Sequence, residues 1–212
     1  MINFTRTLFL APHTDDIELG CGGTLAKVLE QGSEVYAAAF STADESLPQG
    51  LPPGTLREEF LRAMKTLKVP ENNVFVYSYP VRRFSYYRQE ILEELIDLRH
   101  KVSPELVFIP SGYDLHQDHQ VLHREAQRAF KDVSILAYEL AWNHMAFSTQ
   151  VFITLKKHHV NAKWAALQEY HTQMQLSRPY FTRDFIEGLA RVRGTQVKSE
   201  WAEAFEVLRI KW

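Results

Sequence analysis

The chain has 212 residues, of which 45% are hydrophobic, 24% charged and 12% aromatic, and these proportions exclude disordered and coiled-coil classes. Its 24 basic and 26 acidic side chains give a formal net charge of -2, which provides no field to attract a polyanion. We therefore expect an ordinary folded enzyme that has no nucleic-acid partner.

Cysteines and long apolar segments are scarce. The single cysteine, Cys21, has no partner for an internal disulfide, and the first residues contain only a short apolar run before charges appear. No stretch approaches the roughly 20 apolar residues that a membrane-spanning helix requires. We expect a cytoplasmic protein without a membrane span, and the sequence leaves its oligomeric state open.

The first elements indicate a parallel unit of strand, helix and strand. The short apolar run RTLFLA at residues 6–11 is ended by Pro12, which predicts a buried strand. A glycine-rich entry then leads into a helix over about residues 24–31, which Gly32 ends. The strand VYAAAF follows from Val35.

The alternation continues after a long loop at residues 41–54, which is rich in proline, glycine and serine and which we expect to cover a site. The patterns predict helices at 55–69, 91–102 and 120–130, strands at 73–80, 106–110 and 134–140, then a strand within 147–155, helices at 161–173 and 181–192, and a last apolar stretch at 204–210. We predict one α/β domain over residues 1–212, Rossmann-like, with three layers, a mostly parallel sheet and helices on both faces.

Two polar clusters each follow a predicted strand. The first, APHTDDIELGCGGT, contains His13, Asp15 and Asp16. The second, SGYDLHQDHQ, contains Asp114, His116, Asp118 and His119. Because open α/β sheets gather ligands at the carboxyl ends of their strands, we expect the two clusters to be neighbours in space.

These residue types indicate a metal site. A catalytic zinc takes three protein ligands and keeps an open position for water. His13 and Asp16 lie on one tight loop, and His119 from the second cluster is the natural third ligand. Such a site polarises a carbonyl and lowers the pKa of bound water, which amide hydrolysis needs. The ligand set also suits other divalent ions such as Fe²⁺.

The remaining residues of the clusters are candidates for proton transfer. Asp15 is adjacent to a ligand and is the first candidate for general base, its alternative being a helix cap. His116, held by Asp118, would carry a proton or stabilise an oxyanion. Asp118 could instead cap the following helix, and Asp114 is interpreted as loop polarity.

The segment PHTDDIELGCGGT resembles the signature of the PIG-L/LmbE deacetylases, His-Pro-Asp-Asp-Glu followed by glycines, and HQDH resembles its His-x-Asp-His partner. The resemblance implies that zinc is bound by His13, Asp16 and His119. It also implies that Asp15 is the general base and that His116 and Asp118 form a charge-stabilising dyad.

The chain departs from that signature at two positions. Thr14 stands where the proline is usual, and Ile17 stands where the glutamate is usual, with Glu18 one place later. The likeness nevertheless extends along the chain through AYELAWNH, the segment around Lys163 and Tyr170, and WAEAFEVLR, which look like a bacterial branch associated with surface-sugar biosynthesis.

The resemblance implies an N-deacetylase, in a setting such as glycan or surface-polysaccharide biosynthesis. A zinc-bound water would attack the acetyl group of an amino-sugar-containing small molecule, with Asp15 as general base. The alternatives are a zinc hydrolase that acts on another amide or ester, and an inactive Rossmann-like binding domain, which the departures at Thr14 and Ile17 motivate.

Other features have two interpretations each. The run from Gly20 to Gly23 could suggest dinucleotide binding, but Leu25 occupies the last position of that pattern, so close helix packing explains the glycines better. Cys21 is interpreted as a small buried residue.

The pairs Arg82–Arg83 and Arg191–Arg193 could hold a phosphate or a sugar nucleotide, or lie in solvent. The aromatic residues Tyr86, Tyr87, Trp142 and Phe147 could stack on a sugar or belong to the core.

Overall fold

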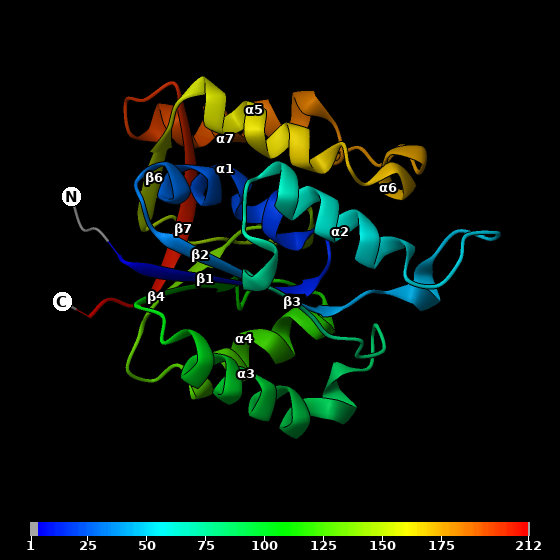
Figure 1. Ribbon diagram of the computed structural model, residues 1–212. Coiled ribbons are helices and arrows are strands. Elements are labelled where there is room, and N and C mark those ends of the chain that lie inside the picture. The colour runs from blue at the N-terminus through cyan, green and yellow to red at the C-terminus, as the bar shows by residue number, and fades with distance from the viewer. Residues whose placement is uncertain (1–3, 212) are drawn as a thin grey trace.

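The computed structural model describes residues 4–211, and a seven-stranded mixed sheet runs through its middle (Figure 1). The strands are β1 (Arg6–His13), β2 (Glu34–Ser41), β3 (Val74–Val76), β4 (Leu106–Pro110), β5 (Ser134–Tyr138), β6 (Val151–Leu155) and β7 (Trp201–Arg209). They lie in the order β3-β2-β1-β4-β5-β7-β6. The first five are parallel, and β7 is antiparallel to both β5 and β6. The predicted mostly parallel sheet is confirmed.

Helices cover both faces of this sheet. They are α1 (Asp16–Glu30), α2 (Thr55–Thr66), α3 (Arg88–Val102), α4 (Gln117–Ala129), α5 (Lys157–Leu167), α6 (His171–Gln175) and α7 (Arg183–Gln196). Figure 1 shows α3 and α4 on one face and α1, α2, α5 and α7 on the other, which confirms the three-layer α/β architecture. Within residues 4–211, no helix combines the length and apolar character needed to cross a membrane.

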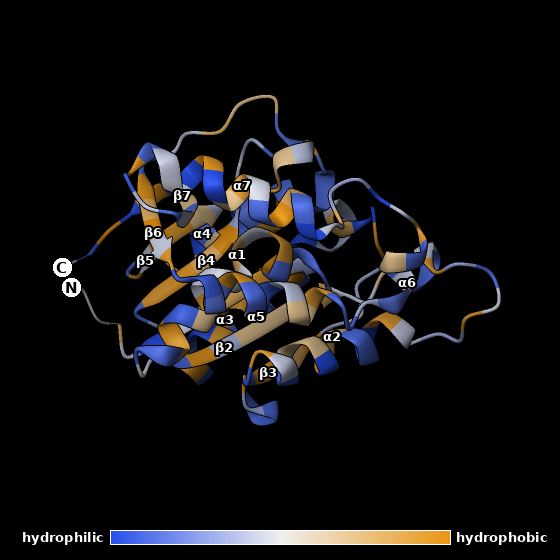
Figure 2. Cartoon of the chain, turned by 90° about the horizontal axis from the view of Figure 1, so that it is seen from above, coloured by the Kyte–Doolittle hydropathy of each residue, from blue (hydrophilic) through white to orange (hydrophobic). Residues whose placement is uncertain are grey.

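The sheet separates two hydrophobic cores. Successive side chains of a strand point to opposite faces. Leu8 and Leu10 of β1 therefore belong to the core under α3 and α4, whereas Phe9 and Ala11 belong to the core under α1 and α2. Burial on both faces explains why this strand is apolar at every position instead of alternating. Figure 2 shows the hydrophobic colouring concentrated on the strands between the helices.

Helix α1 begins well before its predicted start, and it is kinked. The backbone of Cys21 leaves helical geometry (φ -148°, ψ 23°). Beyond the kink, the carboxylate of Glu203 on β7 accepts hydrogen bonds from the backbone amides of Gly23 (3.1 Å) and Thr24 (2.6 Å), and Lys163 neutralises it at 2.7 Å. The second half of α1 is thus capped by a residue remote in sequence, which local patterns could not reveal.

The glycines of α1 allow close packing, as predicted. A Cβ atom at Gly20 would overlap the ring of Tyr138, and one at Gly23 would lie 2.6 Å from Leu155. Cys21 between them is fully buried, as expected for a small core residue. The packing of this helix on β5 and β6 therefore accounts for the glycine-rich run.

The predicted helix at 161–173 is in fact two helices, α5 and α6. Helix α6 starts afresh because Glu59 of α2 accepts hydrogen bonds from the amide (3.0 Å) and the hydroxyl (2.6 Å) of Thr172. At the break, the Tyr170 hydroxyl donates to the carbonyl of Thr14 and lies 2.8 Å from Glu18. The break therefore places Tyr170 against the loop that carries the first polar cluster.

Candidate metal centre

The two polar clusters meet at the carboxyl ends of the neighbouring strands β1 and β4, where the strand order of the sheet reverses. Strand β1 pairs with β2 on one side and with β4 on the other, so the loops that follow β1 and β4 diverge at their carboxyl ends. Such a switch point is where open α/β sheets bind ligands. His13 ends β1, Asp16 opens α1, and His116 and His119 lie at the start of α4. The expected juxtaposition is present.

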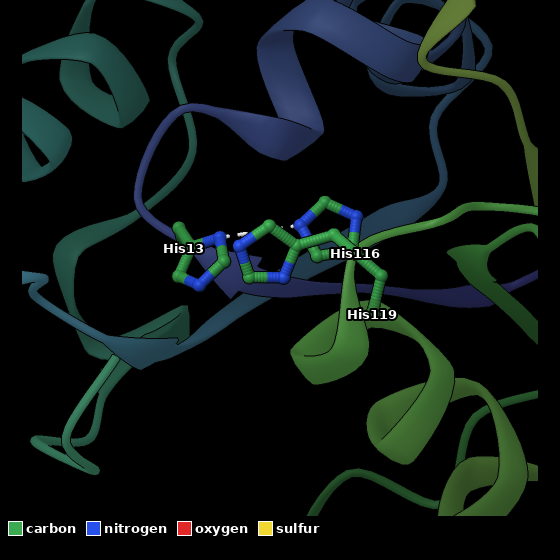
Figure 3. Close-up of side chains that lie close together, drawn as sticks. All are labelled: His13, His116 and His119. Carbon is green, nitrogen blue, oxygen red and sulfur yellow. Dashed lines mark hydrogen bonds between the residues drawn. The ribbon is translucent and has the colours of Figure 1, made fainter. Parts of the chain in front are cut away.

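Three donor atoms form a nearly equilateral triangle at this point. Nδ1 of His13 lies 3.4 Å from Oδ2 of Asp16 and 3.2 Å from Nε2 of His119, and Asp16 Oδ2 lies 3.4 Å from His119 Nε2. Figure 3 shows the two imidazoles facing each other from β1 and α4. Tetrahedral ligands about 2.0–2.1 Å from a zinc ion are about 3.3–3.4 Å apart, so the triangle has the dimensions of a metal site.

Two further carboxylates determine which nitrogen of each histidine faces the triangle. Asp118 accepts a hydrogen bond from Nε2 of His13 at 3.1 Å, and Asp114 accepts one from Nδ1 of His119 at 2.8 Å. When both rings are neutral, this arrangement turns two imidazole lone pairs and the Asp16 carboxylate, which also accepts a hydrogen bond from the His13 amide at 2.8 Å, toward one point that suits a cation. Carboxylates that hold metal-binding histidines in this way are usual in metal sites.

Asp114 is thus a structural partner of the centre, and its interpretation as loop polarity is wrong. The residue is fully buried, and its second oxygen also accepts a hydrogen bond from the amide of His116 at 2.8 Å. One carboxylate fixes both His119, a candidate ligand, and its neighbour His116. Its position five residues before His119 carries no sequence signal on its own, because the contact depends on the loop that precedes α4.

We expect Asp114→Ala to weaken metal affinity about 10- to 100-fold, because His119 loses the partner that orients its ring. Asp114→Asn, which keeps an acceptor for the ring N–H, should lose less. Competition with a chromogenic zinc chelator measures the affinity. Asp132→Ala, at an exposed surface aspartate, is the control. An unchanged affinity in folded Asp114→Ala would mean that the contact does not support the site.

The charges of the triangle also favour a cation. Burial alone would lower the pKa of His13, but the carboxylates of Asp118 and Asp16 outweigh it and raise the pKa to about 10. Burial alone would raise the pKa of Asp16, but His119 and His13 outweigh it and lower the pKa to about 2. Without a metal, His13 therefore holds a proton at neutral pH, and a bound metal ion takes the place of that proton.

Asp15 lines the cavity next to the triangle. It occupies the N-cap position of α1, yet its side chain makes no capping hydrogen bond, so the alternative role as a helix cap is not realised. Burial and the neighbouring charge of Asp16 raise its pKa to about 6. A carboxylate with a pKa near neutrality suits the transfer of a proton from water.

His116 is arranged as a neutral donor. Its Nδ1 accepts a hydrogen bond from the backbone amide of Asp118 at 3.2 Å, so the neutral ring carries its proton on Nε2. Burial, and then the charges of His119 and His13, lower its pKa to about 4. The structure differs from the expected pairing, because the carboxylate of Asp118 contacts His13 and not His116.

Helix α4 begins at Gln117 with His116 as its N-cap, so Asp118 does not serve as the cap of this helix. His116 also lies near both candidate ligand histidines, since donor atoms of His13, His116 and His119 are all within 4.8 Å of one another. Asp16 is the better third ligand, because it is anionic and lies 3.4 Å from both partners.

A second group of possible ligands, Glu30, His158 and His159, lies at the opposite end of α1. Nδ1 of His159 accepts a hydrogen bond from the amide of Lys156 at 3.0 Å, so its Nε2 carries the proton that it donates to Glu30 at 2.5 Å. This nitrogen is engaged in connecting α5 to α1. The group is therefore explained by helix capping and packing.

The residues that depart from the expected signature are all buried near the centre. The carbonyl of Thr14 accepts a hydrogen bond from Tyr170, and Ile17 is part of the hydrophobic core. Burial raises the pKa of Glu18 well above its usual range, which favours a protonated carboxyl beside the Tyr170 hydroxyl. Tyr170 thus supports the loop that carries Asp15 and Asp16.

A cavity of about 350 Å³ opens beside the triangle. Besides the metal-site residues, its lining includes Ala43, Ser46, Leu56, Val81, Arg82, Trp142, Asn143, Gln173, Arg178 and Tyr180. The loop at 41–54 contributes to this wall, as expected. Trp142 stacks on Tyr180 with ring centroids 3.9 Å apart, whereas Tyr86, Tyr87 and Phe147 are not among the lining residues described.

The segment after α6 was not predicted to reach the site, yet it supplies Arg178 and Tyr180. Of the two arginine pairs, only Arg82 lines the cavity. Arg193 is held by Glu139 through two contacts of 2.7 Å, and Arg191 lies over the ring of Trp201. These contacts explain the second pair structurally.

Comparison with known proteins agrees with this geometry. A family model described as GlcNAc-PI de-N-acetylase (PIG-L) matches residues 8–130, the part of the chain that contains both clusters. The chain is 29% identical over 169 residues to the uncharacterized deacetylase YaiS of Escherichia coli (strain K12), covering 77% of this chain and 89% of that protein.

Two solved structures share the fold. The conserved protein TT1542 from Thermus thermophilus superposes with a TM-score of 0.80 at 21% identity and covers 100% of this chain and 97% of that chain. The N,N'-diacetylchitobiose deacetylase from Pyrococcus horikoshii has a TM-score of 0.74 at 18% identity and covers 97% of this chain and 84% of that chain. At such identities the likeness shows the fold alone.

Proposed function

Because the match spans more than half of its sequence, the chain belongs to the PIG-L family of deacetylases, and we propose that it is a metal-dependent N-deacetylase acting on an amino-sugar-containing small molecule. The observation that carries the proposal is the triangle of His13 Nδ1, Asp16 Oδ2 and His119 Nε2, with sides of 3.2–3.4 Å. Zinc is the ion we favour, and Fe²⁺ also suits these ligands.

When bound at this triangle, a divalent metal would supply Lewis acidity, which polarises the acetyl carbonyl and acidifies a water molecule. In this mechanism Asp15, which lines the cavity next to the triangle, would accept the proton of the attacking water and pass it to the leaving nitrogen. The N–H at Nε2 of His116 would donate to the carbonyl oxygen as negative charge develops there. One C–O bond forms and the C–N bond breaks, so the products are the free amine and acetate.

Other buried groups maintain this arrangement. Asp118 orients His13, Asp114 orients His119, and Tyr170 supports the backbone at Thr14. We also propose that residues 1–212 act as one catalytic domain, because Tyr180 and Arg178 from the C-terminal part line the same cavity as the N-terminal cluster.

The test is acetate release from a panel of N-acetylated amino sugars, including N-acetylglucosamine and N,N'-diacetylchitobiose. We expect release by the metal-loaded protein, loss of release after chelation, and recovery when zinc or Fe²⁺ is restored. Release that persists in a demonstrably metal-free sample would contradict the mechanism. Release of a different acid or of phosphate from matched esters, without acetate, would favour the alternative hydrolase.

A further inference from the structure

A second cavity, of about 400 Å³, lies beside the loop that joins β4 to α4. This loop, helix α4, residues 148–150 and strand β7 line it, and it has no lining residue in common with the catalytic cavity. Tyr113, Ser148 and Gln150 are its exposed rim, whereas Glu206 and His123 are buried lining residues. A cavity of this volume is large enough for a small molecule.

The hydrogen bonds of Glu206 are those of an ionised carboxylate. Its Oε2 accepts a hydrogen bond from the hydroxyl of Ser111 at 2.6 Å, and its Oε1 accepts one from the backbone amide of Ser148 at 3.3 Å. The Ser111 hydroxyl in turn accepts a hydrogen bond from the amide of Tyr113 at 3.1 Å, so its own proton is directed to Glu206. Both carboxyl oxygens therefore act as acceptors, which is the pattern of the charged form.

This charge has no cationic partner. Glu206 is only 4% exposed, and among residues 4–211 the glutamates that form ion pairs do not include it. By contrast, Glu203 on the same strand is paired with Lys163 at 2.7 Å, and Glu139 is paired with Arg193 at 2.7 Å. Because burial of an unpaired charge is costly, buried charges usually have a partner. The cavity thus presents an anion that a cationic ligand would neutralise.

His123 adds a second acceptor to the same cavity. Its Nδ1 donates a hydrogen bond to the carbonyl of Pro110 at 2.8 Å, so Nε2 carries the lone pair of the neutral ring. Burial lowers the pKa of His123, which favours that neutral ring. A Cβ atom at Gly112 would lie 2.6 Å from Nε2, so the glycine leaves room for the imidazole. Arg124, whose charge also acts on His123, is exposed and is not among the lining residues described.

We propose that this cavity binds a small organic molecule through a primary ammonium group. An ammonium carries three N–H donors and a positive charge, which the carboxylate of Glu206 and Nε2 of His123 are suited to accept. The ring of Tyr113, which is 61% exposed at the rim, offers a π-face to the cation, and Val207 and Leu208 provide apolar wall for the rest of the ligand. The site is separate from the candidate metal centre and does not depend on the deacetylase activity.

The first experiment is a titration of the isotope-labelled full chain, followed by the NMR signals of its backbone amides. The probes are cyclohexylamine, which is an ammonium at neutral pH, and cyclohexanol, which has the same ring with a hydroxyl group. We expect the amine to shift the signals of Gly112, Ser148 and Val207 saturably, and to bind at least about 10-fold more tightly than the alcohol. Equal affinity for the two probes, or shifts confined to the catalytic cavity, would overturn the proposal.

Two sets of variants test the named residues with the same titration. Glu206→Gln retains the shape of the side chain without its charge, and should weaken amine binding about 10- to 100-fold. Tyr113→Ala should weaken it about 2- to 5-fold through loss of the ring face, whereas Tyr113→Phe should bind like wild type. Glu93→Gln is the matched control, because Glu93 is an exposed glutamate of α3 outside the cavity lining.

The Tyr113 variants keep the test decisive if Glu206→Gln does not fold, because the Tyr113 side chain is exposed. Circular dichroism and thermal melting show which variants are folded. Amine affinity that is unchanged in folded Glu206→Gln would contradict the ammonium site. If that variant is unfolded, unchanged affinity in Tyr113→Ala would contradict it instead.

Discussion

Wild-type protein is expected to hold one metal ion per chain, and His13→Ala and His119→Ala are each expected to lose it completely on gel filtration. Each substitution removes one corner of a triangle whose sides are 3.2–3.4 Å, and the two remaining donors cannot enclose an ion. Activity should fall with the metal content. Elemental analysis of the filtered protein gives the stoichiometry directly.

Folding of these variants needs its own control, because both histidines contact buried carboxylates. His119→Ala leaves Asp114 without the ring N–H at 2.8 Å, which costs about 1–3 kcal/mol for a buried acceptor. Circular dichroism and thermal melting identify variants that remain folded. His171→Ala, at an exposed histidine of α6, should retain full metal content. Metal retained in folded His13→Ala and His119→Ala would place the ion elsewhere and remove the basis of the mechanism.

The sequence allowed the sheet and the meeting of His13, Asp16 and His119 to be predicted together, because both depend on local signals. A buried strand reads as a continuous apolar run, as at residues 106–110, where β4 has the predicted bounds. The carboxyl ends of neighbouring parallel strands must share an edge. Polar residues that directly follow β1 and β4 are therefore expected to lie close together, and this expectation does not depend on where the intervening helices begin and end.

The features that the sequence concealed depend on contacts between distant segments. The extent of α1 depends on Glu203 of β7, whose carboxylate accepts a hydrogen bond from the backbone amide of Thr24 in the second half of α1. The two residues are 179 positions apart in the sequence. The break between α5 and α6 depends on Glu59 of α2. The hydrophobic periodicity of a sequence reports only on residues that lie within one helix or one strand. Such partners become visible only when the chain is folded.

The groups around the three donor atoms also depend on contacts that the sequence does not reveal. Asp118 was expected to hold His116, its near neighbour in the sequence, but the first turn of α4 directs its carboxylate to His13 and its amide to His116. Arg178 and Tyr180 reach the cavity from the connection after α6, where no motif marks them. Residue type and spacing therefore predicted which of His13, Asp16 and His119 come together better than they predicted the groups that surround them.

Asp15→Asn is expected to lower kcat/KM by about 10²- to 10⁴-fold while the metal content stays at one per chain, since Asp15 is not a corner of the triangle. The isosteric amide retains the shape of the residue but cannot accept the proton of water. The measurement is acetate release at saturating metal, with the bound metal determined on the same samples. Activity close to wild type would exclude Asp15 as the general base.

The pH profile distinguishes loss of the base from a change in shape. Burial and Asp16 raise the pKa of Asp15 to about 6, and a dication at the triangle would lower it again. Because Asp15 must be deprotonated to accept a proton, wild-type kcat/KM should decline as pH falls through a value at or below about 6. Asp15→Asn should lack this acidic limb wherever metal remains bound. If the variant keeps the limb at constant metal content, the limb belongs to another group, and the proton would have to be accepted elsewhere in the cavity.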